Sequence, residues 1–99
     1  MKRPEKLKLL GKKWTVLYKA ALDTKDDIGE CDLEHQTISL KDGMKAEQEQ
    51  STLLHECIHA ISDSLGLGLT EKQVQGLETG LYDLNSSNPR FFSYLKKNK

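Results

Sequence analysis

Two histidines and a glutamate, His55, His59 and Glu56, are the residues whose types and spacing could do chemistry. They lie in the run LLHECIHAI, where the histidines are four residues apart and the glutamate follows the first. On an α-helix such histidines project from one face, so both imidazoles can reach one Zn²⁺ ion about 2 Å from each. Glu56 lies about 100° further round, outside the metal's ligands but near a water held on it. The pattern predicts two zinc ligands and a general base.

The alternative interpretation is a chance occurrence of a short pattern on the buried side of a helix. A lone buried histidine is more often a core residue than a metal ligand. Here, however, two imidazoles and a carboxylate share an otherwise apolar run. Burying them is costly unless a polar or metallic partner satisfies them, and this favours the metal.

A catalytic zinc site needs a third protein ligand and keeps one position open for water. Asp63 lies one turn after His59, but three residues in line along a straight helix cannot surround one ion. We expect Asp63 to be solvated or to support a ligand by hydrogen bonding. Glu71 and Glu78, in the following helical segment, are better candidates for the third ligand. Helical phase does not separate them, because they lie on the same side of that helix.

Two predicted helices position these residues. The first covers Ala46 to Leu65 and ends at Gly66. Its apolar residues follow one helical face: Leu53, Leu54, Ile58, Ile61 and Leu65. The second helix starts at a capping-box signature, Thr70 with Gln73. Its expected core stripe is Val74, Leu77, Leu81 and Leu84. Residues 85–89 end this helix, and 90–95 predict a last short helical turn.

The first half of the chain predicts strands. Residues 6–18 form a hairpin or bent strand about Gly11-Lys12-Lys13, with Trp14, Val16 and Tyr18 on one face. The segment GECDLEHQTISLKDG predicts a second hairpin with its turn at 32–35. The order of strands and then helices predicts an α+β fold, with three to four strands in antiparallel hairpins packed against two helices.

Composition predicts a single cytoplasmic domain over residues 1–99, with flexible tails at 1–5 and 96–99. Fifteen basic and fifteen acidic residues leave no net charge, so neither nucleic acid nor an anionic membrane is an expected partner. No apolar stretch has the length of a signal peptide core or a membrane span. Cys31 and Cys57 are expected to be free thiols. The oligomeric state is not readable from these patterns.

Four segments together resemble a known family. LLHECIHAI, the following LTEKQVQGLETGLYDL and NPRFF, and the upstream GECDLEHQTISL resemble small phage- and prophage-encoded metallopeptidases of the ImmA/IrrE type. These are gluzincins reduced to little more than a zincin-like catalytic core, and the resemblance covers residues 8–95. It implies zinc bound by His55 and His59, with Glu56 as the general base. The family's third ligand falls on Glu71, although larger relatives place theirs further downstream, which favours Glu78.

The resemblance also implies a substrate strand and a host. A hairpin strand beside the site pairs with an extended peptide, and here it falls on four residues: Thr37, Ile38, Ser39 and Leu40. A phage or prophage protein would act in the bacterial cytoplasm. Longer relatives carry a helix-turn-helix or sensor domain for which this sequence has no room, so regulated repressor cleavage is not carried over.

Three functions compete. The leading hypothesis is a zinc-dependent endopeptidase acting on a protein or peptide substrate, with a metal-activated water and Glu56 as base. The alternative is a catalytically weak or inactive phage module that zinc stabilises and that binds a protein without cutting it. A single-metal hydrolase acting on RNA or another non-peptide substrate is disfavoured by the neutral charge balance.

Overall fold

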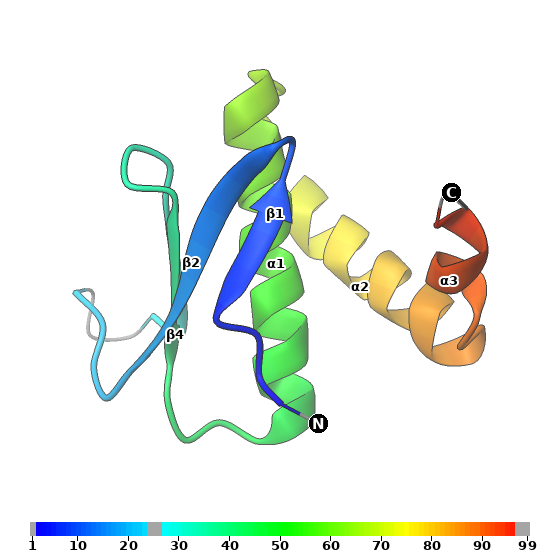
Figure 1. The fold of residues 1–99 in the computed structure, drawn as a ribbon, viewed down its shortest axis with the longest axis horizontal. Helices are drawn as coiled ribbons and strands as arrows, with labels where there is room; N and C mark the ends of the chain where they lie inside the picture. Colours follow the sequence, from blue (N-terminus) through cyan, green and yellow to red (C-terminus); the bar gives the residue numbers. More distant parts are fainter. Residues whose placement is uncertain (1, 24–26, 97–99) are drawn as a thin grey trace.

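The fold is an α+β arrangement of four strands followed by three helices. A computed structural model describes residues 2–23 and 27–96 (Figure 1). The strands are β1 (Lys6–Leu9), β2 (Lys12–Lys19), β3 (Gly29–Asp32) and β4 (Thr37–Lys41). The helices are α1 (Ala46–Leu65), α2 (Glu71–Ser87) and α3 (Phe91–Leu95). The predicted α+β order of strands and then helices is therefore confirmed.

The four strands form one mixed sheet in the order β1-β2-β4-β3. β1 pairs antiparallel with β2, and β3 pairs antiparallel with β4, so both expected hairpins are present. The hairpins join through β2 and β4, which run parallel with Val16 opposite Ile38. This parallel pair was not predicted. It makes β4 an inner strand and leaves β3 at an edge of the sheet.

The first hairpin turns earlier than expected. Leu10 and Gly11 occupy the turn with φ of 51° and 79°, while Lys12 and Lys13 already belong to β2. Two successive residues with positive φ are typical of the tight turn whose twist matches that of antiparallel strands. The turn therefore starts one residue earlier and ends two residues earlier than the predicted Gly11-Lys12-Lys13, because Leu10 adopts the left-handed conformation beside the glycine.

The core lies between the sheet and α1. Trp14 and Val16 are each 2% exposed, and they form one buried cluster with Ile38, Leu40 and Ala60. Thr15 and Leu17, the residues after each of them in β2, are exposed, which confirms the predicted alternation along this strand. Leu53 and Cys57 of α1 pack against the same cluster. The core therefore fixes the face that α1 turns to the sheet.

Two residues of the predicted apolar stripes are exposed. Leu65 is 55% exposed at the last position of α1, and Leu77 of α2 is 44% exposed. α2 packs against α1 and then extends away from the sheet (Figure 1). Val74 is its one fully buried residue. Leu81 and Leu84, further along α2, are half-buried, so the predicted stripes were overestimated at Leu65 and Leu77.

Both predicted helix boundaries between α1 and α2 are confirmed. Gly66 ends α1 in the left-handed region with φ of 65°, and Leu67 N–H donates to the Ser62 carbonyl (2.9 Å). Ser62 is buried, and its Oγ accepts from Leu69 N–H (3.0 Å). Thr70 and Gln73 then form the reciprocal capping box that starts α2. These bonds determine where Glu71, the first residue of α2, lies.

The start of the chain is tied to the sheet and to α1. Arg3 pairs with Asp42 (2.9 Å) and Glu49 (3.2 Å) and stacks over the ring of Tyr18. Val16 N–H donates to the Glu5 carbonyl (2.8 Å). Residues 3–5 of the expected N-terminal tail therefore contact β2, α1 and the segment after β4 in the structure. Of the expected C-terminal tail, residues 97–99 lie outside the described chain.

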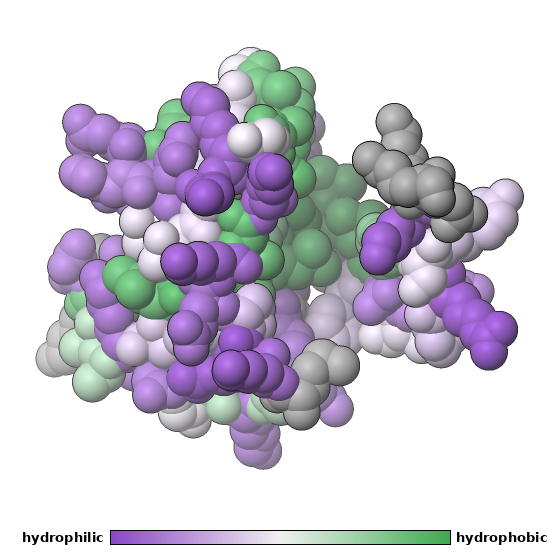
Figure 2. Space-filling view, viewed as in Figure 1, coloured by the Kyte–Doolittle hydropathy of each residue, from purple (hydrophilic) through white to green (hydrophobic). Residues whose placement is uncertain are grey.

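The surface divides by polarity. Figure 2 shows mostly polar side chains over the strands and an apolar area that runs from one end of α1 onto the adjoining part of α2. The exposed Leu65 and Leu67 belong to this junction. No helix in the described part of the chain combines the length and apolar character that a bilayer crossing requires.

Candidate metal centre

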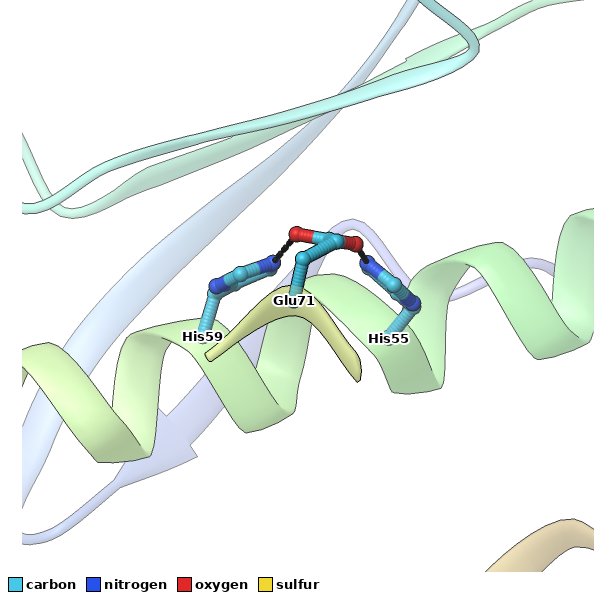
Figure 3. A group of neighbouring side chains, drawn as sticks. All are labelled: His55, His59 and Glu71. Carbon is cyan, nitrogen blue, oxygen red and sulfur yellow. Dashed lines mark hydrogen bonds and ion pairs between the residues drawn. The ribbon is translucent and has the colours of Figure 1, made fainter. Parts of the chain in front are cut away.

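His55, His59 and Glu71 meet between α1 and the start of α2. Glu71 Oε1 lies 2.6 Å from His55 Nε2, and Glu71 Oε2 lies 3.0 Å from His59 Nε2. Figure 3 shows the carboxylate between the two imidazole rings, which both come from one face of α1. The four-residue spacing places the rings 5.0 Å apart, and the short link brings Glu71 across them.

The three side chains could hold a metal ion. One ligand atom from each of His55, His59 and Glu71 lies within 4.8 Å of the others. Tetrahedral zinc requires donor atoms about 3.3 Å apart at bond lengths near 2 Å. The Glu71 side chain is 67% exposed, so a small rotation of it opens the space between the rings. Two imidazoles and one carboxylate also leave one tetrahedral position for water.

Glu78 contacts the other nitrogen of His55. His55 Nδ1 donates to Glu78 Oε1 (2.9 Å), and both side chains are largely buried. Burial lowers the pKa of His55, but the Glu78 hydrogen bond and the charge of Glu71 outweigh it and raise the pKa overall. A proton on Nδ1 leaves the Nε2 lone pair free for a metal. The geometry therefore groups Glu71 with the metal-facing atoms and gives Glu78 the position that orients an imidazole.

Glu56 lies beside this group without a partner. Its side chain is 8% exposed, and within residues 2–23 and 27–96 it makes no hydrogen bond or ion pair. A Cβ added at Gly29 of β3 would lie 3.0 Å from Glu56 Oε2, so the strand passes directly over the carboxylate. Burial raises the pKa of Glu56, and the two neighbouring histidines partly oppose that shift. A shielded carboxylate with free acceptor sites is suited to proton transfer.

A hollow of about 930 Å³ connects these groups to solvent. Residues of β3, α1 and α2 line it, including both histidines and Glu56. Lys41 N–H donates to the Ile28 carbonyl (2.9 Å), so Ile28 hydrogen-bonds toward β4. In an antiparallel pair every second residue hydrogen-bonds to the neighbouring strand. The backbone N–H and C=O groups of Gly29 and Cys31 therefore point away from β4. Among the described residues, the sheet edge beside the site is therefore that of β3.

This topology corrects the expected substrate strand. Thr37, Ile38, Ser39 and Leu40 were expected to pair with an extended peptide. They belong to β4, which β2 and β3 flank on its two sides. An inner strand has no free edge, so a peptide cannot pair with these residues while the sheet is intact. The sequence pattern did not reveal the parallel pairing that encloses β4.

The remaining singled-out residues divide between the hollow and the periphery. Asp63 is exposed and lines the hollow, as does Cys31. Burial raises the pKa of Cys31 to about 12 and that of Cys57 to about 11, so both thiols are neutral at pH 7. His35 lies away from the site, in the β3–β4 turn, where its Nδ1 contacts Asp32 Oδ2 (2.8 Å).

Sequence reasoning missed the acidic residues before and within β3. Asp23, Asp27 and Glu30 line the hollow opposite the histidines. The available signal was the concentration of acidic residues in DTKDDIGECDLE, of which the sequence patterns related only GECDLE to structure, as part of the second hairpin. Its relation to the histidines depends on the packing of β3 against α1.

Comparison with known proteins gives no match to this chain: no family model, curated protein or solved structure is significantly similar to it.

Proposed function

We propose that this protein is a zinc-dependent endopeptidase of the ImmA/IrrE type that hydrolyses peptide bonds in the bacterial cytoplasm. The observation that carries the proposal is the unpartnered, buried Glu56 beside two histidines and a glutamate with the composition of a zinc site. The open hollow at these residues is consistent with access for a polypeptide.

Each residue has a distinct part in this proposal. His55, His59 and Glu71 hold one Zn²⁺ ion, and Glu78 fixes the orientation of His55. Bound zinc supplies Lewis acidity toward the scissile carbonyl and lowers the pKa of water. Glu56 takes a proton from the attacking water and returns it to the leaving amine. The partial enclosure of Glu56 under β3 limits competition from bulk water.

The β3 edge is the proposed place for the substrate backbone. The outward groups of Gly29 and Cys31 can exchange hydrogen bonds with an extended peptide, which would then lie along the hollow. Such pairing positions the peptide through main-chain atoms and leaves its alternate side chains to determine selectivity.

Glu56→Gln tests the assigned base. Zinc content should stay the same, since Glu56 is not among the metal-facing atoms, while hydrolysis of a quenched peptide library should fall by at least about a hundredfold. Glu47→Gln, an exposed change on the same helix, is the matched control and should leave both measurements unchanged. Turnover at the wild-type rate in Glu56→Gln would refute the role of this carboxylate.

The same experiment separates the second candidate function. A zinc-stabilised binding module would take up zinc and melt at a higher temperature with the metal than without it. However, neither the wild-type protein nor any variant would cleave the library. Zinc uptake without cleavage would therefore replace the peptidase proposal with this one.

A further inference from the structure

The hollow carries a local excess of negative charge that the whole chain does not have. The chain has fifteen basic and fifteen acidic residues. Among the described residues lining the hollow there are seven carboxylates and no lysine or arginine. Three of the carboxylates, Glu56, Glu71 and Glu78, already have a part in the proposed zinc site. The other four are Asp23, Asp27, Glu30 and Asp63. A divalent cation would neutralise only part of this charge.

The four additional carboxylates lie toward both ends of the hollow. Asp63 is one turn after His59 on α1. Asp27 is two residues before Gly29 in the chain. The backbone of Gly29 packs on Thr52 of α1, which is about one turn before His55. Thr52 and Asp63 are roughly 16 Å apart along the helix at 1.5 Å per residue. Negative charge is therefore available on either side of the metal group.

These carboxylates are largely free to meet a ligand. Glu30 accepts a hydrogen bond from the Asp23 backbone N–H (2.8 Å) through Oε1 alone. Asp27 and Asp63 have no hydrogen-bond or ion-pair partner in the part of the chain that the structure describes. Glu56, which is 8% exposed and makes no hydrogen bond or ion pair within residues 2–23 and 27–96, lines the same hollow. No fully buried side-chain oxygen of the described residues lacks a partner, so the Glu56 carboxylate keeps access to solvent, and it lines this hollow. A carboxylate placed in this way favours a polar ligand in the hollow.

We propose that the hollow selects polypeptide segments with lysine or arginine on both sides of the bond to be cut. This inference rests on the proposed peptidase function for the position of the cut, but the charge preference applies to binding itself. Backbone pairing at the edge of β3 does not depend on the sequence of the peptide. The acidic side chains of the hollow therefore distinguish basic peptides from neutral and acidic ones. Long basic side chains can reach exposed carboxylates while the peptide backbone stays at the strand.

Binding to the zinc-loaded Glu56→Gln protein measures the preference without turnover. The probes are fluorescent peptides in which alanine alternates with lysine, glutamine or glutamate, followed by anisotropy. We expect the lysine peptide to bind at least about tenfold more tightly than the glutamine peptide, and the glutamate peptide to bind most weakly. The preference should shrink as the salt concentration rises.

A double variant locates the preference in the hollow. Asp27→Asn with Asp63→Asn should reduce the ratio of lysine to glutamine affinity by about tenfold. The control, Glu34→Gln with Glu47→Gln, removes the same net charge from exposed positions outside the hollow and should preserve the ratio. Melting temperature and zinc content verify that the double variant and its control both fold. If the double variant does not fold, Asp63→Asn alone takes its place.

The outcomes separate this inference from the peptidase proposal. A lysine preference that depends on Asp27 and Asp63 supports the inference even if the wild-type protein cuts nothing. Equal affinity for the three peptides, or a preference that both double variants lose equally, would overturn it. Cleavage of neutral peptides as fast as basic ones would also overturn it, while leaving the peptidase proposal intact.

Discussion

At the scale of single residues, the site depends on which nitrogen of His55 each glutamate contacts. Glu71 and Glu78 are seven residues apart, so their side chains share one side of α2. Glu71 contacts Nε2 and Glu78 contacts Nδ1 of the same ring. A histidine that binds a metal through Nε2 commonly donates Nδ1–H to a carboxylate. The two glutamates can therefore serve one histidine in different ways.

Substitution of each glutamate by glutamine distinguishes the ligand from the orienting residue. Glu71→Gln should weaken zinc binding by more than about a hundredfold, because it replaces a charged ligand. Glu78→Gln should cost about ten- to a hundredfold, because an amide oxygen can still accept from Nδ1–H. Competition with a chelator of known affinity measures both. A larger loss in Glu78→Gln than in Glu71→Gln would reverse the assignment.

At the scale of elements, the approach of β3 to α1 shapes the site. A Cβ at Gly29 would lie 2.8 Å from Thr52 Cγ2 and 3.0 Å from Glu56 Oε2. Such separations are shorter than side chains tolerate without displacement. Gly29 therefore lets the strand pass close over the helix, and this closeness shields Glu56.

Gly29→Ala should lower the free energy of unfolding by about 1 to 3 kcal/mol through overpacking against α1. Adding Thr52→Ser removes the nearer of the clashing groups and keeps the hydroxyl bond to the Gln48 carbonyl (2.7 Å), so it should restore part of the loss. Denaturant unfolding measures each change.

Gly80→Ala is the control for this prediction. Gly80 lies in α2 with no heavy atom near the added Cβ, so alanine should stabilise the protein by about 0.5 to 1 kcal/mol. If Gly29→Ala proved as harmless as Gly80→Ala, the close approach of β3 to Glu56 would be wrong.

Local sequence signals predicted the elements well but not their long-range pairing. Gly66 and the Thr70–Gln73 capping box are short-range features, and each marks a boundary where expected. The pairing of β2 with β4 joins segments about twenty residues apart and has no local signature. That pairing is why the expected substrate strand is enclosed.

The candidate site shows the same division. His55, Glu56 and His59 share one helix, so their spacing alone predicted their arrangement. Asp27 and Glu30, in contrast, reach the hollow only because the sheet folds over α1. The roles of Glu71 and Glu78 differ only in the nitrogen of His55 that each contacts, which the sequence does not show. Sequence therefore predicted the helical part of the site, and the structure was needed for what faces it.

At the scale of the whole molecule, the chain consists of a well-packed body and a weakly attached arm. The body is the sheet with α1, around Trp14 and its buried neighbours. The arm is α2 with α3, in which Val74 is the one fully buried side chain among the described residues. Polar contacts supply much of the remaining connection, including His55 with Glu78 and Tyr82 with Gln50 (3.0 Å). A metal held by α1 and Glu71 would therefore link the arm to the body.

Removal of zinc should loosen the arm before the body. At a free zinc concentration a hundred times the dissociation constant, binding contributes about 2.7 kcal/mol to the stability of whatever structure the site requires. Hydrogen exchange with and without a chelator should show protection lost mainly in α2, while β2 and β4 keep theirs because Trp14, Ile38 and Leu40 do not depend on the site. Glu71→Gln in the presence of zinc should resemble the chelated protein. Equal loss of protection in the sheet would show instead that the body and the arm unfold as one unit, and no loss anywhere would remove the metal's proposed structural role.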